Sequence, residues 1–108
     1  MSDLEKLENF RRAKMKLNLR EIDKLEKMLQ EAGETYERTD MGSGVQIVVL
    51  KDGSRYWDAV TTIFSYGHED GLLEVMGAPV VDRERDGDIV VGGLTAEEVM
   101  ERAKGRRH

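Results

Sequence analysis

A two-residue turn between two apolar segments is the feature that most restricts how this chain can fold. Asp52-Gly53 follows residues 45–50, which are mostly β-branched, and precedes residues 55–66, which alternate apolar and polar side chains. Both turn residues tolerate a positive φ, as the common two-residue hairpin turn requires. The pattern therefore predicts an antiparallel hairpin. Counting back from the turn places these residues opposite each other: Leu50 and Arg55, Val49 and Tyr56, Val48 and Trp57, Ile47 and Asp58.

Helices are predicted on both sides of this hairpin. Apolar residues recur every three or four positions over residues 3–16 and again over residues 18–32, which is the spacing of one helical face. Thr95 and Glu98 have the spacing of a capping box, so a last helix is expected over residues 96–104.

The remaining segments predict further strands and give the fold class. Residues 36–39 are expected to form an edge strand, and residues 71–77 a strand in preference to a short helix. Pro79 and the charged residues 82–88 predict a loop, after which β character returns. We expect an α+β fold with two N-terminal helices, a small antiparallel sheet of about four strands, and a closing C-terminal helix packed on one face.

The length of 108 residues fits a single domain. Its core is expected over residues 18–104, with residues 1–17 as a helical extension and residues 105–108 as a basic tail. The core is acidic, and an acidic surface repels the phosphate backbone, so direct binding to nucleic acid is not expected.

Cysteine and long apolar segments are both missing from the sequence. The absence of cysteine suits a reducing compartment, and no segment has the length of a membrane span or the pattern of a secretion signal. We therefore expect a cytoplasmic protein that is not inserted in a membrane.

Acidic and aromatic residues in the second half of the chain suggest a surface that binds a partner protein. Residues 69–101 hold ten acidic side chains but only Arg83 and Arg85 as basic ones. Such a surface would steer the chain towards a basic groove, with an aromatic side chain as anchor. The predicted partner-binding residues are Tyr66, His68, Glu69, Asp70, Glu74, Asp82, Glu84, Asp86 and Asp88. The alternative is that these carboxylates only keep the protein soluble.

Two other interpretations concern the same residues. A hydrolase would use His68 as general base, but no activated nucleophile accompanies it, and a polar turn between strands is the preferred explanation of these residues. The spacing of Asp82, Glu84, Asp86 and Gly87 resembles the start of a calcium-binding EF-hand loop. Because Gly93 stands where that loop needs its last carboxylate, we expect no metal site and no cofactor.

Asp58 is unusual because it alternates with Tyr56 and Val60 on one face of the second hairpin strand. A carboxylate among such neighbours needs hydrogen bonds if it is buried. Tyr56 and Asp58 are therefore candidates for a polar pocket, unless this face simply meets water.

Several segments resemble a family of small uncharacterised proteins from phages and mobile elements of low-GC Gram-positive bacteria. The similar segments are residues 29–38, Tyr56-Trp57-Asp58-Ala59, Ser65-Tyr66-Gly67, residues 71–77, and residues 91–99. They span about three-quarters of the chain and leave the N-terminal helix outside the resemblance. The resemblance implies no catalytic residue.

The expected function is that of a non-enzymatic protein-interaction module. As the resemblance implies, its partner would be a host or phage protein, for example a CRISPR nuclease or another defence effector inhibited by binding. A nucleotide-sequestering protein is the first alternative, and the hydrolase using His68 is the second. The first helix ends in a basic cluster, which suggests contact with an acidic partner or with a second copy of the chain in a homodimer; the cluster consists of Arg11, Arg12, Lys14 and Lys16.

Overall fold

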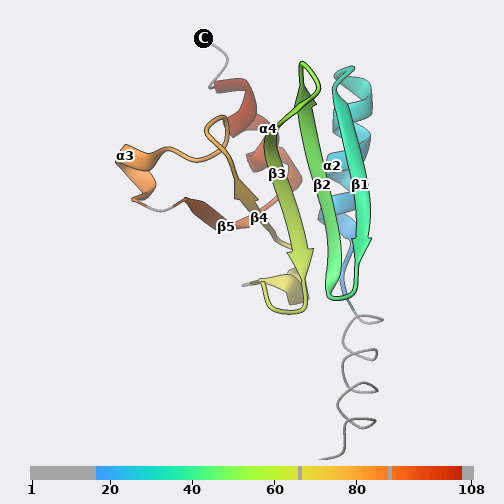
Figure 1. Ribbon diagram of the computed structural model, residues 1–108. Coiled ribbons are helices and arrows are strands. Elements are labelled where there is room, and N and C mark those ends of the chain that lie inside the picture. The colour runs from blue at the N-terminus through green and yellow to red at the C-terminus, as the bar shows by residue number, and fades with distance from the viewer. Residues whose placement is uncertain (1–16, 66, 88, 106–108) are drawn as a thin grey trace, which may run out of the picture.

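The computed structural model describes residues 17–65, 67–87 and 89–105. These residues form one five-stranded antiparallel sheet with two longer helices behind it (Figure 1). The strands follow the chain order across the sheet: β1 (Thr35–Met41), β2 (Gly44–Lys51), β3 (Ser54–Thr62), β4 (Leu73–Met76) and β5 (Val90–Leu94). The predicted α+β class is confirmed, but the sheet has five strands where about four were expected. The predicted helix over residues 3–16, Tyr66, Asp88 and residues 106–108 lie outside the described residues.

The hairpin of β2 and β3 forms around the predicted turn, with one change in register. Asp52 and Gly53 have φ values of 53° and 78°, and Leu50 lies opposite Arg55 as expected. A bulge then leaves Tyr56 as an extra residue, so the later predicted pairs are wrong by one residue. The pairs observed are Val49 and Trp57, Val48 and Asp58, and Ile47 and Ala59.

β3 ends at Thr62, four residues before the predicted end. The chain turns there because the Ser65 hydroxyl accepts a hydrogen bond from the Thr62 amide at 3.2 Å, and the Ser65 amide donates to the Thr62 carbonyl at 3.1 Å. A short 3-10 helix, η1 (His68–Asp70), then leads to β4, the strand expected near residues 71–77.

The helix α2 (Arg20–Glu31) begins two residues after Asn18, within the predicted helical range of residues 18–32. Asn18 Oδ1 accepts a hydrogen bond from the Arg20 amide at 2.9 Å, so it still supports the helix start. Gly33 follows the helix with a φ of 72°, a left-handed conformation that glycine adopts without strain.

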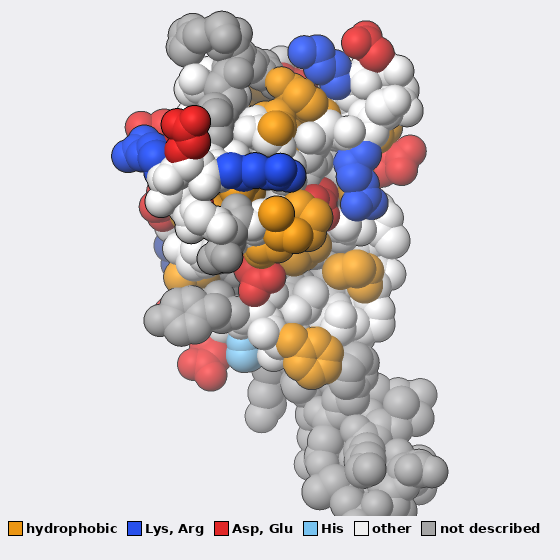
Figure 2. Space-filling view, turned by 60° about the vertical axis from the view of Figure 1, so that its left-hand side comes forward, with side chains coloured by type: hydrophobic (Ala, Val, Ile, Leu, Met, Phe, Trp, Pro, Cys, Tyr) orange, Lys and Arg blue, Asp and Glu red, His pale blue; other side chains and the backbone are white. Residues whose placement is uncertain are grey.

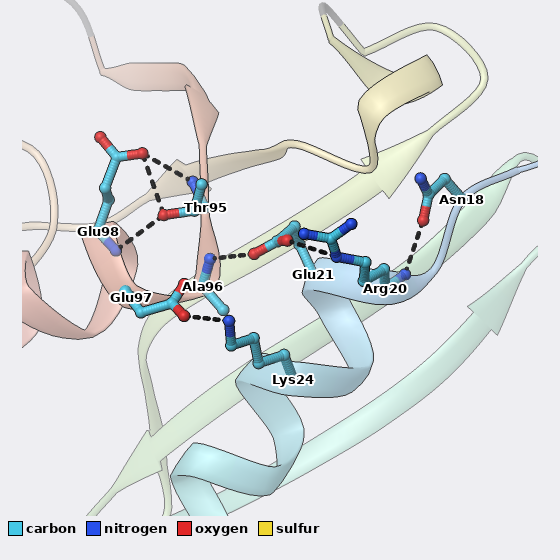
Figure 3. Close-up of polar contacts among 8 residues, drawn as sticks. All are labelled: Asn18, Arg20, Glu21, Lys24, Thr95, Ala96, Glu97 and Glu98. Carbon is cyan, nitrogen blue, oxygen red and sulfur yellow. Dashed lines mark hydrogen bonds and ion pairs between the residues drawn. The ribbon is translucent and has the colours of Figure 1, made fainter.

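Two helices follow β4. Residues 83–86, expected in a loop, form the short helix α3 (Arg83–Asp86), because the Asp82 side chain accepts hydrogen bonds from the Glu84 and Arg85 amides. The last helix, α4 (Ala96–Gly105), begins at the predicted capping box (Figure 3). The Thr95 amide donates to Glu98 Oε1 at 3.1 Å, and the Glu98 amide donates to Thr95 Oγ1 at 3.2 Å.

The hydrophobic core lies between one face of the sheet and the helices α2 and α4. Its largest fully buried side chain is Trp57, which lies on the same face as Ile47, Val49 and Val75. The two helices also contact each other, with Ile22 and Leu25 of α2 and Val99 and Met100 of α4 in the same cluster. No helix of the described residues is long and apolar enough to cross a membrane.

Candidate functional site

The second face of the sheet has no helix over it in Figure 1, and we call it the open face. Side chains alternate along each strand, so the residues between the core positions point to this side. One row crosses all five strands through directly paired residues: Glu37, Val48, Asp58, Met76 and Val90. The next row contains Thr39, Gln46, Val60 and Glu74.

Asp58 lies at the centre of the open face and is only 6% exposed. Its Oδ2 accepts a hydrogen bond of 2.7 Å from Gln46 Nε2. Its Oδ1 is buried and has no hydrogen-bond partner. Because a buried acceptor without a partner is unfavourable by about 1–3 kcal/mol, this atom is the strongest sign of a missing contact on this face.

The side chains around Asp58 are a mixture of apolar groups and carboxylates. Val48 is 8% exposed, although it lies outside the main core cluster, while Met76 is 43% exposed. Glu37 and Glu74 belong to the strands β1 and β4 on either side of Asp58. The open face thus combines apolar surface with three acidic side chains.

Glycine and lysine shape the margins of this face. A Cβ atom on Gly92 of β5 would come within 3.3 Å of Glu74 Cγ, so the glycine leaves room for the Glu74 side chain. At the hairpin end, the Lys51 ammonium lies 4.8 Å from the centre of the Tyr56 ring, in a cation–π contact. Figure 2, which turns the β4 and β5 side forward, shows apolar side chains separated by charged ones.

The predicted partner-binding residues are distributed over three places. His68, Glu69 and Asp70 form η1 at the lower end of the sheet in Figure 1, while α3 lies at the left beyond β5. Glu74 points to the open face, and Glu69 and Asp70 are exposed. The structure therefore places Glu74, but not η1 or α3, in the two rows of the open face, next to the row that contains Asp58.

The acidic residues around α3 have structural contacts. Asp82 caps the helix, and Asp86 Oδ2 accepts hydrogen bonds from Arg102 Nη1 at 3.1 Å and from the Asp82 amide at 3.0 Å. The hydrogen bond from Arg102 is the main cause that lowers the pKa of Asp86. Glu84 is exposed. A pocket of about 680 Å³ lies between α3 and α4, lined among others by Arg85, Asp86, Glu101 and Arg102.

A catalytic base would need a carboxylate or a nucleophile within hydrogen-bond distance, but the contact of His68 is with the backbone. Its Nδ1 lies 3.0 Å from the Ser65 carbonyl oxygen, which can only accept, so Nδ1 carries the proton in this contact. Within the described part of the chain, no group of three or more His, Cys, Asp or Glu residues could hold a metal ion.

Sequence reasoning found Asp58 but missed Gln46, its hydrogen-bond partner. The available signal was that Gln46 is the one polar residue between Val45 and Leu50. The two side chains are diagonal neighbours, since Gln46 pairs with Val60 and Asp58 pairs with Val48. The predicted register, wrong by one residue, set Asp58 opposite Ile47 of the core face and so concealed this contact.

No protein-family model matches this chain, and the comparisons with curated proteins and with solved structures find no significant match either.

Proposed function

We propose that this protein is a non-enzymatic interaction module that binds a partner protein through the open face of its sheet. The observation that carries the proposal is the buried Asp58 carboxylate, whose Oδ1 has no hydrogen-bond partner. Bound protein would cover the half-exposed Met76 beside Asp58, and it would supply a donor to the enclosed Oδ1 once the side chains over this atom move aside.

The charge of the open face indicates the kind of partner. Glu37, Asp58 and Glu74 come from three different strands, so the carboxylates are spread across the sheet. Such a distribution favours a basic partner surface and makes association faster at low salt. We propose a host or phage protein with a basic groove, such as a nuclease of a defence system, whose activity would be blocked by occupation of the groove.

A nucleotide-sequestering function has less support from the same residues. Phosphate groups would meet the carboxylates of Glu37, Asp58 and Glu74, and like charges repel. The pocket between α3 and α4 is lined by both acidic and basic side chains, and its Arg102 already contacts Asp86. The open face therefore fits a protein partner better than a nucleotide.

Two matched variants test which surface binds. Met76→Lys places a positive charge on an exposed position of the open face, where it should repel a basic partner without opening the core. Glu69→Lys combined with Asp70→Lys places positive charge on η1 instead. In captures from host lysate at low and high salt, we expect the Met76→Lys variant to lose its partner and the η1 variant to retain it.

The opposite result would assign partner binding to a different surface. If the η1 variant loses the partner and Met76→Lys keeps it, the binding surface is η1 and the open-face proposal is wrong. Circular dichroism and thermal melting of both variants establish that they remain folded.

A further inference from the structure

We propose that Asp58 and Gln46 form a receptor for a guanidinium group, and that the partner presents an arginine side chain to it. The inference rests on the proposed function, because the arginine belongs to the protein that binds the open face. It goes further by naming the chemical group that the site recognises and the two residues that recognise it.

The first argument is the orientation of the Gln46 amide. A carboxylate can only accept hydrogen bonds, so the contact with Asp58 Oδ2 requires the Gln46 NH₂ group to point at it. The amide oxygen of Gln46 consequently remains as an acceptor, and no hydrogen bond to it is found among the described residues. The pair thus has two acceptors without a donor, Gln46 Oε1 and the enclosed Asp58 Oδ1, and a guanidinium group reaches Asp58 Oδ1 only when the side chains over this atom move aside.

The second argument concerns the donor that fits these acceptors. A guanidinium group carries five N–H donors in one rigid plane and cannot accept, so it can donate to more than one acceptor. It is also more weakly hydrated than the ammonium of lysine, which makes it the better cation for a site that is almost fully buried. The aliphatic part of the arginine would pack against Val48, Val60 and Met76.

The third argument is that no residue in the described part of the chain supplies a cation to Asp58. Among the described residues, no ion pair involves this carboxylate. Arg38 is held by Asp23 and Glu26 on the helix side of the sheet, and the Lys51 ammonium lies over the Tyr56 ring. The described residues therefore give this carboxylate no positive charge, and the arginine of the partner would supply one.

Small probes test the receptor without knowledge of the partner. The full chain, labelled with ¹⁵N, would be titrated with agmatine, which carries a guanidinium group on an aliphatic stem. We expect saturable shifts of the Gln46 side-chain amide and the Asp58 backbone amide at millimolar agmatine. N-carbamoylputrescine, in which a neutral urea group replaces the guanidinium, and cadaverine, a diamine, should bind at least about tenfold more weakly, because neither offers a charged planar set of donors.

Variants of the chain provide the controls. Asp58→Asn replaces an acceptor oxygen by a donor and should abolish the agmatine shifts, while the dispersion of the same spectra reports whether the variant is folded. Glu69→Gln removes an exposed carboxylate on η1 and should leave the shifts unchanged. Equal binding of agmatine and cadaverine, persistence of the shifts in Asp58→Asn, or no shift at Gln46 at tens of millimolar would each overturn the proposal.

The outcomes separate this inference from the proposed function. If agmatine fails to bind Gln46 and Asp58, but Met76→Lys still loses the partner, the guanidinium receptor is wrong and the open face remains the binding surface. If agmatine binds as expected but Met76→Lys retains the partner, the receptor stands as a site for small guanidinium compounds and the open-face function is wrong.

Discussion

Glu21 is a charged side chain that is only 4% exposed, and its contacts account for its position. Its Oε1 accepts a hydrogen bond of 2.9 Å from the amide of Ala96, the first residue of α4 (Figure 3). The first amides of a helix have no partner within the helix itself. The sequence predicts Glu21 as part of the start of its own helix, but the structure uses it to cap the last one.

Replacement of Glu21 by alanine should therefore destabilise the protein. The Ala96 amide would stay buried without an acceptor, which should lower the free energy of unfolding by about 1–3 kcal/mol. Urea denaturation measures this loss, and Glu21→Gln, which keeps an acceptor oxygen, should lose less. Glu97→Ala breaks an exposed ion pair with Lys24 between the same two helices and serves as the control. An equal loss in Glu97→Ala would show that the charges, and not the buried hydrogen bond, hold α2 and α4 together.

At the scale of elements, the parts that follow from local sequence chemistry were predictable. The Asp52-Gly53 turn and the Thr95–Glu98 capping box depend only on residues that are close in the chain. The bulge beside Tyr56 depends on how neighbouring strands meet, and the end of β3 at Thr62 depends on a Ser65 contact that the alternating pattern of residues 55–66 does not reveal. Sequence reasoning therefore found Asp58 on its strand, but could not find the contact with Gln46 across the hairpin.

The contact between α3 and α4 should make stability depend on pH in the acidic range. Arg102 and the Asp82 amide hold the pKa of Asp86 below its ordinary value of 3.8. A depressed pKa means that the folded chain binds the proton less readily than the unfolded chain, so this stabilisation is present above the ordinary pKa and is lost as pH falls through the lower, folded value.

Asp86→Asn tests this contact because it removes the titrating group at the same size. We expect the melting temperature of the original chain to fall more steeply below about pH 4 than that of the variant. The variant should still lose some stability at acidic pH, because the pKa of Glu97 is also lowered in the folded chain. Thermal melting over a series of acidic buffers measures both slopes. Parallel slopes would mean that Asp86 and Arg102 contribute nothing to stability in solution.

At the scale of the whole molecule, the core is one-sided, and this arrangement is what leaves a face for binding. α2 and α4 cover the side of the sheet that contains Trp57 and Ile47, and both residues are almost completely buried. The opposite side holds Asp58 and Met76 without a helix over them in Figure 1. Stability therefore resides on one side and the proposed recognition on the other, so substitutions at exposed positions of the open face can alter binding while the core remains intact.

The same arrangement predicts how the molecule opens. β2 is hydrogen-bonded to strands on both sides, and its Ile47 and Val49 are fully buried, so their amides should exchange with solvent only through global unfolding. α3 has four residues, none of them buried, and should open locally. Hydrogen exchange followed by NMR should therefore show much stronger protection at Ile47 and Val49 than at the hydrogen-bonded amides of Asp86 and Gly87.

Arg102→Ala sharpens this test because it removes the hydrogen bonds from α4 to Asp86 and to the Val80 carbonyl. Protection of the Asp86 and Gly87 amides should fall further than protection of the Ile47 amide, because only the α3 amides depend on the hydrogen bonds of Arg102. If all four amides instead exchange with one free energy, and all fall equally in Arg102→Ala, then α3 unfolds only together with the sheet. That result would make α3 part of the global folding unit despite its lack of buried residues.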